Sequence, residues 1–311
     1  MRSKSKIKVK AKTIVEQACL EVYGFREILE ELDDRIRLAC QSESTLNNYS
    51  RKLAQICLHF GRPPQDITEK ELNQYLASKA RLSKSPSLSD FKFSVYGLRY
   101  CFKFLGLNDR LIQLPSIKSS SKLPVVLNYD ECKSLFKAPS LLKHRVLLSL
   151  IYSAGLRVRE ANRLKISDID TGRMMIHIRQ SKYKKDRYVP LSPMVLIGLL
   201  KYFSVDKPVD YLFNGTEPGS PLSIGGMRWA LGEAKRRCGF QKRITLHTLR
   251  HSYATHLLQH GLDIVTIKEL LGHVRIETTL VYLQVVNLNR CNLFSPFDKL
   301  YSQSSFSHYY N

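Results

Sequence analysis

The sequence has 311 residues, enough for two ordinary domains, and its 43% of hydrophobic residues can form real cores. It carries 49 Lys and Arg against 27 Asp and Glu, and the formal net charge of +22 indicates a polyanionic partner such as DNA or RNA. Because it contains neither a run of about 18 apolar residues nor an apolar secretory segment, we expect neither a membrane-spanning nor a secreted protein.

The seven cysteines are odd in number, widely spaced and free of any C-x-x-C pair. This pattern argues against a disulfide framework and against a zinc site built from cysteines. We therefore expect a reducing compartment, the cytoplasm. A basic membrane-binding protein would also fit the charge, but no basic amphipathic helix or lipidation signal is evident.

The N-terminus, residues 1–18, begins with basic residues at every second position and no acid among them: Arg2, Lys4, Lys6, Lys8, Lys10 and Lys12. Such a segment is typical of a basic arm that lies along phosphates, and equally of a solvated tail. The two interpretations are compatible, and we assign these residues to a basic arm.

Residues 19–113 read as a small helical domain. Apolar residues recur three and four apart over 46–60 and again over 91–105, which predicts two amphipathic helices. Between them, Thr68 and Glu71 form a capping-box pattern that opens another helix. One more helix is indicated, less clearly, before residue 40.

Residues 114–124, LPSIKSSSKLP, are rich in Ser and Pro and show no periodicity. They predict an extended linker, with an ordinary surface loop as the alternative. The patterns on its two sides differ, which favours the linker.

The second half, residues 125–290, has a mixed pattern. A helix is predicted from residue 142 to near Gly155, followed by strands over 174–178 and 188–191, with Pro190 ending the second strand or placing it at a sheet edge. Helices return after residue 245. The fold class we predict is mostly α with a small antiparallel β-sheet, in two domains.

Two segments of this half carry groups suited to a phosphate. Arg157 follows Gly155 at a helix end, and a guanidinium group can hold two phosphate oxygens at once. His247 and Arg250 are three apart, on one helical face, and together could neutralise a phosphate and serve it with a proton.

A metal site competes for the same helix. His247 and His251 are four apart, as are His256 and His260, but Thr248 stands where the H-E-x-x-H metalloprotease pattern needs Glu. We expect no metal and no other cofactor, and we assign His251 and His256 as core or capping groups.

Tyr282 lies nine residues after His273. A tyrosine is a weak nucleophile because its ordinary pKa is about 10. Nearby cations stabilise the phenolate and lower that barrier. Taken alone, one tyrosine among 16 would be an ordinary aromatic residue.

The local contexts of these residues make a resemblance specific. GLR with Glu160 three places on, SKYKKDRYVPL at 181–191, LRHSYATHLL and LGH-x4-TT-x2-Y resemble the conserved boxes of the tyrosine recombinases, the phage-type integrases and Xer proteins. The residues that match the family's catalytic set, in its order, are Arg157, Lys182, His247, Arg250, His273 and Tyr282.

The resemblance implies roles for these residues. Arg157 and Arg250 would grip the non-bridging oxygens of one DNA phosphate, and Tyr282 would attack the phosphorus to leave a 3′-phosphotyrosyl link. Lys182 would protonate the departing 5′-oxygen, and the alignment of VPL with the family hairpin favours it over its neighbours Lys184 and Lys185.

The remaining groups would assist. His247 would help move the tyrosine proton, and His273 would hydrogen-bond a phosphate oxygen. Glu160 would support the site, although a plain helix-surface carboxylate is the alternative. We expect Lys184, Lys185 and Arg187 to bind DNA.

The resemblance also implies an assembly. Recombination through a Holliday junction needs a homo-tetramer on two double-stranded DNA sites, with an accessory DNA-bending protein or partner recombinase as a further possibility. The aromatic segment 291–311 would dock onto a neighbouring protomer or pack on its own domain. We expect a cytoplasmic, nucleoid-associated enzyme, the kind that mobile elements encode.

Three rival functions share some of these features. They are a DNA-binding protein on this scaffold that does not cleave, a type IB topoisomerase-like nicking-closing enzyme, and a metal-dependent nuclease or protease. The complete set of six residues favours the recombinase over the first, and the missing H-E-x-x-H pattern argues against the third.

Overall fold

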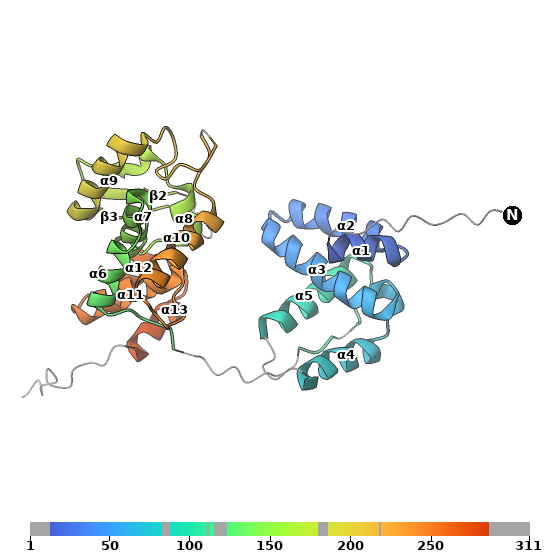
Figure 1. The fold of residues 1–311 in the computed structure, drawn as a ribbon. Helices are drawn as coiled ribbons and strands as arrows, with labels where there is room; N and C mark the ends of the chain where they lie inside the picture. Colours follow the sequence, from blue (N-terminus) through green and yellow to red (C-terminus); the bar gives the residue numbers. More distant parts are fainter. Residues whose placement is uncertain are drawn as a thin grey trace, which may run out of the picture. The chain divides into compact units, whose positions relative to one another are not determined.

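A computed structural model describes residues 13–82, 88–110, 112–114, 123–179, 186–217 and 219–285. The chain divides into two compact units, residues 1–121 and 122–311 (Figure 1). Predictions made for residues 1–12, for most of the linker, for Lys182, Lys184 and Lys185, and for the segment 291–311 lie outside the described residues. In the described part of the chain, no helix is both long and apolar enough to cross a membrane.

The first unit is helical. Its elements are α1 (Ile14–Glu21), α2 (Phe25–Leu38), α3 (Glu43–Phe60), the 3-10 turn η1 (Pro64–Asp66), α4 (Glu69–Leu82) and α5 (Leu88–Phe104). The three helices expected after residue 45 are confirmed. α3 ends at Gly61, whose φ of 65° is the left-handed conformation that glycine adopts most readily.

The stretch before residue 40 holds two helices where one was expected, and α1 begins inside the segment assigned to the basic arm. Thr13 accepts a hydrogen bond from the backbone N–H of Glu16, and the Glu16 side chain accepts one from the Thr13 backbone N–H. This capping box starts a helix whose Ala18 is buried. Residues 14–18 therefore belong to a packed helix, which corrects the predicted extent of the arm.

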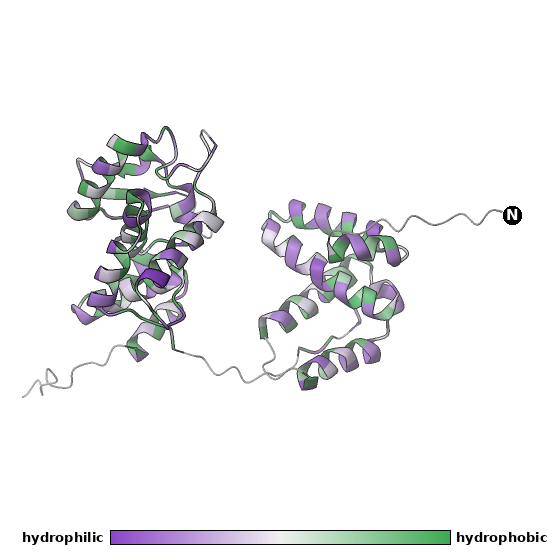
Figure 2. Cartoon of the chain, in the orientation of Figure 1, coloured by the Kyte–Doolittle hydropathy of each residue, from purple (hydrophilic) through white to green (hydrophobic). Residues whose placement is uncertain are grey.

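The core of the first unit forms around α3, which packs against α1, α2 and α5. Fully buried side chains such as Phe25, Leu53 and Leu98 fill it. Hydrophilic and hydrophobic bands alternate along the helices of both units, as expected for amphipathic helices (Figure 2).

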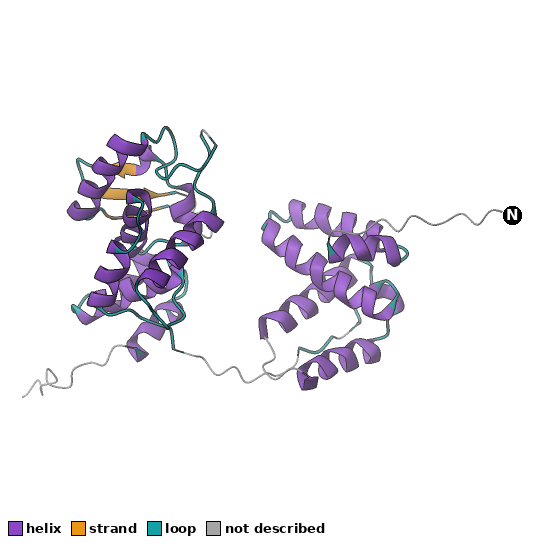
Figure 3. Cartoon of the chain, viewed as in Figure 1, coloured by secondary structure: helices purple, strands orange, loops and turns teal. Residues whose placement is uncertain are grey.

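In the second unit, helices pack around a small sheet (Figure 3). Its elements are α6 (Tyr129–Lys137), α7 (Leu142–Ser153), α8 (Val158–Arg163), η2 (Ile166–Asp168), β1 (Ile169–Asp170), β2 (Met175–Ile178), β3 (Arg187–Pro190), α9 (Pro193–Asp206), α10 (Ile224–Arg237), α11 (Leu246–Gln259), α12 (Ile264–Leu271), α13 (Glu277–Leu280) and η3 (Val281–Gln284). The prediction of a mostly α fold with a small antiparallel sheet is confirmed.

The sheet has the order β1-β2-β3 and is antiparallel throughout. Ile176 pairs with Val189, and both are fully buried on the face turned to the helices. Pro190 lies on the edge strand β3, as predicted, where its missing N–H costs no ladder hydrogen bond.

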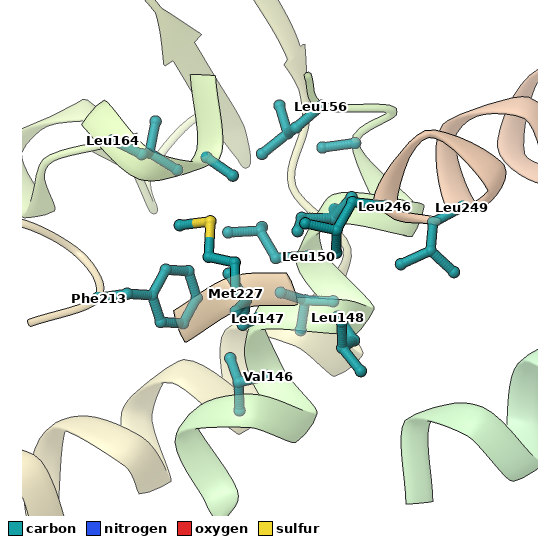
Figure 4. Packing of buried hydrophobic residues seen from close by; sticks show 14 of the residues in the cluster. Val146, Leu147, Leu148, Leu150, Leu156, Leu164, Phe213, Met227, Leu246 and Leu249 are labelled. Atoms are coloured by element: carbon teal, nitrogen blue, oxygen red, sulfur yellow. The ribbon is translucent and has the colours of Figure 1, made fainter. Parts of the chain in front are cut away.

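α7 is the central helix of the second unit. It packs against α9, α10 and α11, and Leu147, Leu148, Leu150 and Ile151 are fully buried. Side chains from α7, α10 and α11 gather in this core (Figure 4).

The chain leaves α7 through Gly155, which has a φ of 58° and lies so close to the ring of Tyr253 that a Cβ would come within 2.5 Å of it. Glycine is therefore required at this turn, and the turn delivers Arg157 to the start of α8.

Candidate active site

Arg157 is the N-cap residue of α8, and its guanidinium group is one of the cations of the site. Its backbone N–H donates to Glu160 Oε2 at 2.7 Å, and its Nη1 donates to Glu160 Oε1 at 2.7 Å. Its Nη2 donates to the carbonyl of Gly272 at 2.7 Å, just past the end of α12. The guanidinium group is thus tied to two elements, and part of its side chain stays exposed.

Glu160 is the buried acid that several arginines share. Arg187 holds it with two parallel hydrogen bonds, Nη1 to Oε1 and Nη2 to Oε2, both 2.9 Å long. Arg250 Nη1 lies 3.8 Å from Oε2. Burial would raise the pKa of Glu160, but the hydrogen bonds and charges of Arg187 and Arg157 outweigh it and hold that pKa at about 2. Glu160 is therefore a structural carboxylate and not a helix-surface group.

The contacts of Arg187 contradict the prediction that it binds DNA. Its side chain is only 9% exposed, and besides gripping Glu160 its Nε donates to the carbonyl of Leu270 at 2.8 Å. Gly272 (φ 62°) makes room for it, since a Cβ there would lie 3.1 Å from Arg187 Cδ and Nη1. Arg187 joins β3, α8 and the end of α12, and it is occupied inside the protein.

Arg250 is buried in α11 and is fixed by two backbone carbonyls, those of Gly155 and Leu271, each at 2.6 Å. Burial and the neighbouring charge of Arg157 lower the pKa of Arg250 to about 9. Three guanidinium groups therefore converge on one carboxylate. Positive charge is in excess, which suits the place to an anion such as a phosphate.

His273 follows Gly272, the left-handed residue that ends α12. Its Nδ1 is hydrogen-bonded to the hydroxyl of the buried Thr279 at 2.9 Å. Burial, together with the charges of Arg250, Arg157 and Arg187, lowers the pKa of His273 to about 3. The imidazole is neutral at ordinary pH and is held by one nitrogen, so its Nε2 is the nitrogen available to a ligand.

Tyr282 lies in η3 and is 2% exposed. Its hydroxyl is hydrogen-bonded to Nδ1 of His251 at 3.1 Å. Burial raises the pKa of Tyr282, while the charges of Arg250 and Arg157 act in the opposite direction. Those two arginines thus favour the phenolate that a nucleophilic tyrosine must develop.

His251, which the sequence suggested as a core or capping group, is instead hydrogen-bonded to Tyr282. Burial, His247 and Arg250 lower its pKa to about 4, so it is neutral at ordinary pH. Burial, then Arg250 and Arg157, also lower the pKa of His247. The signal was present in the sequence, since His251 lies one helical turn after His247 and is therefore on the same face of α11.

The structure brings most of the predicted site residues together. Hydrogen bonds and ion pairs link Arg157, Glu160, Arg187 and Arg250, and the charges of the arginines reach His247, His273 and Tyr282. The three predicted lysines fall in residues 180–185, outside the described residues.

The histidines considered for zinc have other partners. His256 Nδ1 is hydrogen-bonded to the Tyr152 hydroxyl at 2.7 Å, and His260 Nε2 to that of Tyr129 at 2.8 Å. Among the described residues, no group of three or more His, Cys, Asp or Glu side chains could hold a metal ion.

Two family models match the sequence. The phage integrase family matches residues 125–288, and the phage integrase N-terminal SAM-like domain matches residues 28–103. A Sinorhizobium fredii protein designated integrase/recombinase y4qK is 34% identical, over 83% of this chain and 84% of its own. The tyrosine recombinase XerA of Pyrococcus horikoshii is 33% identical, over 83% of this chain and 89% of its own.

A solved structure shares the fold. The site-specific recombinase XerH, bound to its difH substrate in a pre-cleavage complex, superposes with a TM-score of 0.65 at 23% identity. The match covers 90% of this chain and 88% of that one.

Proposed function

The chain belongs to the phage integrase family of tyrosine recombinases, and from this premise we propose that it cuts and rejoins double-stranded DNA at specific sites through a covalent bond to Tyr282. One observation carries the proposal. The charges of Arg157 and Arg250 act on the buried candidate nucleophile Tyr282 and favour its phenolate. Hydrogen bonds to backbone carbonyls, together with the carboxylate of Glu160, hold these two arginines in place.

The proposed step is an in-line displacement at phosphorus. Arg157 and Arg250 bind the non-bridging oxygens, and Tyr282 Oη passes its proton to a histidine of α11 and forms a bond to phosphorus while the bond to the 5′-oxygen breaks. Lys182 supplies the proton that the 5′-oxygen needs, which leaves a 3′-phosphotyrosyl link and a free 5′-hydroxyl. Positioned cations are suited to this step because charge grows on the phosphoryl oxygens in the transition state.

His273 has a supporting role in this scheme. When the Thr279 hydroxyl donates to Nδ1, Nε2 carries the ring proton and can donate it in a hydrogen bond to a phosphate oxygen. The low pKa keeps the ring neutral, so its Nε2–H adds a donor without adding another charge.

The energy of the broken phosphodiester is retained in the tyrosyl link, so rejoining needs no nucleotide cofactor. We infer that a strand from a second site attacks this link, that two such exchanges pass through a Holliday junction, and that four protomers carry them out. The net charge of +22 supports binding to long stretches of DNA. XerH, whose structure shares the fold, is seen on a DNA substrate.

We infer that the two units have different functions. We assign residues 13–113, which include α1, to a core-binding domain and residues 125–290 to the catalytic domain, with 114–124 linking them and 291–311 contacting a second protomer. Lys184 and Lys185 remain our candidates for DNA contacts, whereas Arg187 is committed to Glu160.

Two experiments test this function. First, covalent complexes are isolated from cells that express the protein, and the sequence of the trapped ends identifies the site. A nicked duplex of that site should then accumulate a covalent adduct with the wild-type protein and none with Tyr282→Phe. Relaxation of supercoils without recombinants from a two-site plasmid would instead indicate the topoisomerase-like rival.

The second experiment identifies the acid. A duplex with sulfur in place of the scissile 5′-oxygen has a leaving group that needs no proton. It should restore cleavage to Lys182→Ala and leave the cleavage of Lys184→Ala and Lys185→Ala unchanged. Restoration in one of the other two variants would move the acid to that lysine.

A further inference from the structure

The geometry points to His251 as a further catalytic residue of strand cleavage, the group whose Nδ1 takes the proton of the Tyr282 hydroxyl. This inference rests on the proposed function, in which Tyr282 is the nucleophile. It replaces the role in proton transfer that the family resemblance suggested for His247.

The first argument is contact. Tyr282 Oη and His251 Nδ1 are 3.1 Å apart, and Tyr282 is buried while His251 is half-buried. A neutral phenol beside a neutral imidazole donates its proton to the unprotonated ring nitrogen. Burial, His247 and Arg250 lower the pKa of His251 to about 4, so the ring is neutral at ordinary pH, and its Nε2–H tautomer accepts at Nδ1.

The second argument concerns His247. Among the described residues it forms no hydrogen bond with Tyr282, and its ring centroid lies 6.5 Å from that of His251. Burial lowers the pKa of His247, and so do the charges of Arg250 and Arg157, the two arginines proposed to bind the phosphate. His247 is therefore better placed to serve the phosphate than the nucleophile.

The step balances as a single transfer. As Tyr282 Oη forms its bond to phosphorus, its proton passes to His251 Nδ1, the bond to the 5′-oxygen breaks, and that oxygen takes a proton from Lys182. The pKa of Tyr282 is raised and that of His251 is lowered, so prior ionisation of the pair is disfavoured. Proton transfer therefore accompanies attack, and in rejoining the imidazolium returns its proton to the departing phenolate.

The neighbours of His251 determine when its imidazolium is stable. The charge of Arg250 and the nearby His247, both on α11, disfavour it, and His273 is a neutral neighbour from the segment after α12. A bound phosphodiester would bring negative charge to the same place. The proton can thus be accepted when DNA is present and is not held before that.

The test separates a proton acceptor from a residue that only shapes the site. His251→Gln and the matched control His247→Gln are made with Tyr282 and again with a fluorinated tyrosine of lower pKa at that position, in the full-length protein. The rate of adduct formation on the nicked site is measured for all four. A nucleophile that is already largely ionised no longer needs an acceptor, so we expect fluorination to rescue His251→Gln and not His247→Gln.

In magnitude, loss of a general base slows a step by about 100- to 10,000-fold, and fluorination should recover most of it. Cleavage by His251→Gln at the wild-type rate, or a defect that fluorination leaves unchanged, overturns the inference. His251→Asn is a second variant in the event that His251→Gln folds poorly. If wild-type protein itself forms no adduct, the proposed function has failed, and this outcome is distinct from loss of rescue alone.

Discussion

Glu160→Gln is the substitution that most directly tests how the arginines are held together. The carboxylate is 5% exposed, it makes paired hydrogen bonds with Arg187, and Arg157 and Arg250 share it. The amide keeps the size of the side chain and removes its charge. Three guanidinium groups are then left close together in or near the protein interior without a counter-charge.

The magnitude follows from the pKa of Glu160, which falls from an ordinary value of 4.5 to about 2. At about 1.4 kcal/mol for each pKa unit, the ionised carboxylate contributes roughly 3 kcal/mol to the free energy of unfolding at neutral pH. This agrees with the loss of about 3–5 kcal/mol expected when one partner of a buried ion pair is removed.

The sign of the pH dependence is fixed by the direction of the shift. Because the pKa of Glu160 is depressed in the folded protein, its contribution is complete above about pH 4.5 and is lost as the pH falls toward 2. The difference between wild type and Glu160→Gln should therefore be largest near neutrality and shrink below pH 4.5.

The assay can follow the second unit by itself. The protein has one tryptophan, Trp229 in α10, so its fluorescence during urea titration reports the unfolding of that unit. Asp130→Asn is the matched control, because the Asp130–Lys133 pair is well exposed and its removal should cost less than about 1 kcal/mol. Equal stability of Glu160→Gln and wild type at pH 7 would refute the reasoning.

Three further predictions concern neighbours of this cluster. Arg187→Lys keeps the charge but loses the paired hydrogen bonds to Glu160. The arginines that share Glu160 should then be misplaced, so adduct formation should fall by roughly 100-fold while DNA affinity in a mobility-shift assay stays nearly unchanged. An equal loss of affinity would mean that Arg187 contacts DNA. In Gly272→Ala, the alanine must adopt a φ of 62° with its Cβ against Arg187. Urea titration should therefore show a free energy of unfolding lower by more than about 1 kcal/mol. An unchanged free energy of unfolding would contradict the described packing. Thr279→Val removes the hydroxyl that is hydrogen-bonded to His273, so cleavage should slow by about tenfold. Thr279→Ser keeps the hydroxyl and should cleave at nearly the wild-type rate. Equal rates for the two variants would show that this hydrogen bond does not contribute to cleavage.

The sequence predicted the helices and the strands where apolar periodicity was strong. The regular spacing over 46–60, the alternation over 174–178 and the glycines after helices correspond to observed elements. It predicted α1 poorly because the basic run up to Lys12 leads directly into it. The Thr13–Glu16 capping box that begins the helix has the sequence form T-x-x-E and could have been read.

Residue order predicted most of the residues that the structure brings together at the site, but it did not predict their contacts. Sequence alone did not separate Arg187 from the other cations of the hairpin. The separating feature is strand alternation, since Arg187 lies two residues before the buried Val189 and shares its face of β3. The meeting of Glu160 with Arg187 and Arg250 joins residues distant in sequence, and only the folded chain brings them into contact.

The central claim is that Tyr282 forms the covalent bond to DNA. Mass spectrometry of the nuclease-trimmed adduct, formed on a nicked site identified in cells, tests it most directly. We predict a nucleotide attached through a 3′-phosphate to the peptide that contains Tyr282, and no adduct from Tyr282→Phe. Attachment at another residue, or an adduct that persists in Tyr282→Phe, would contradict it.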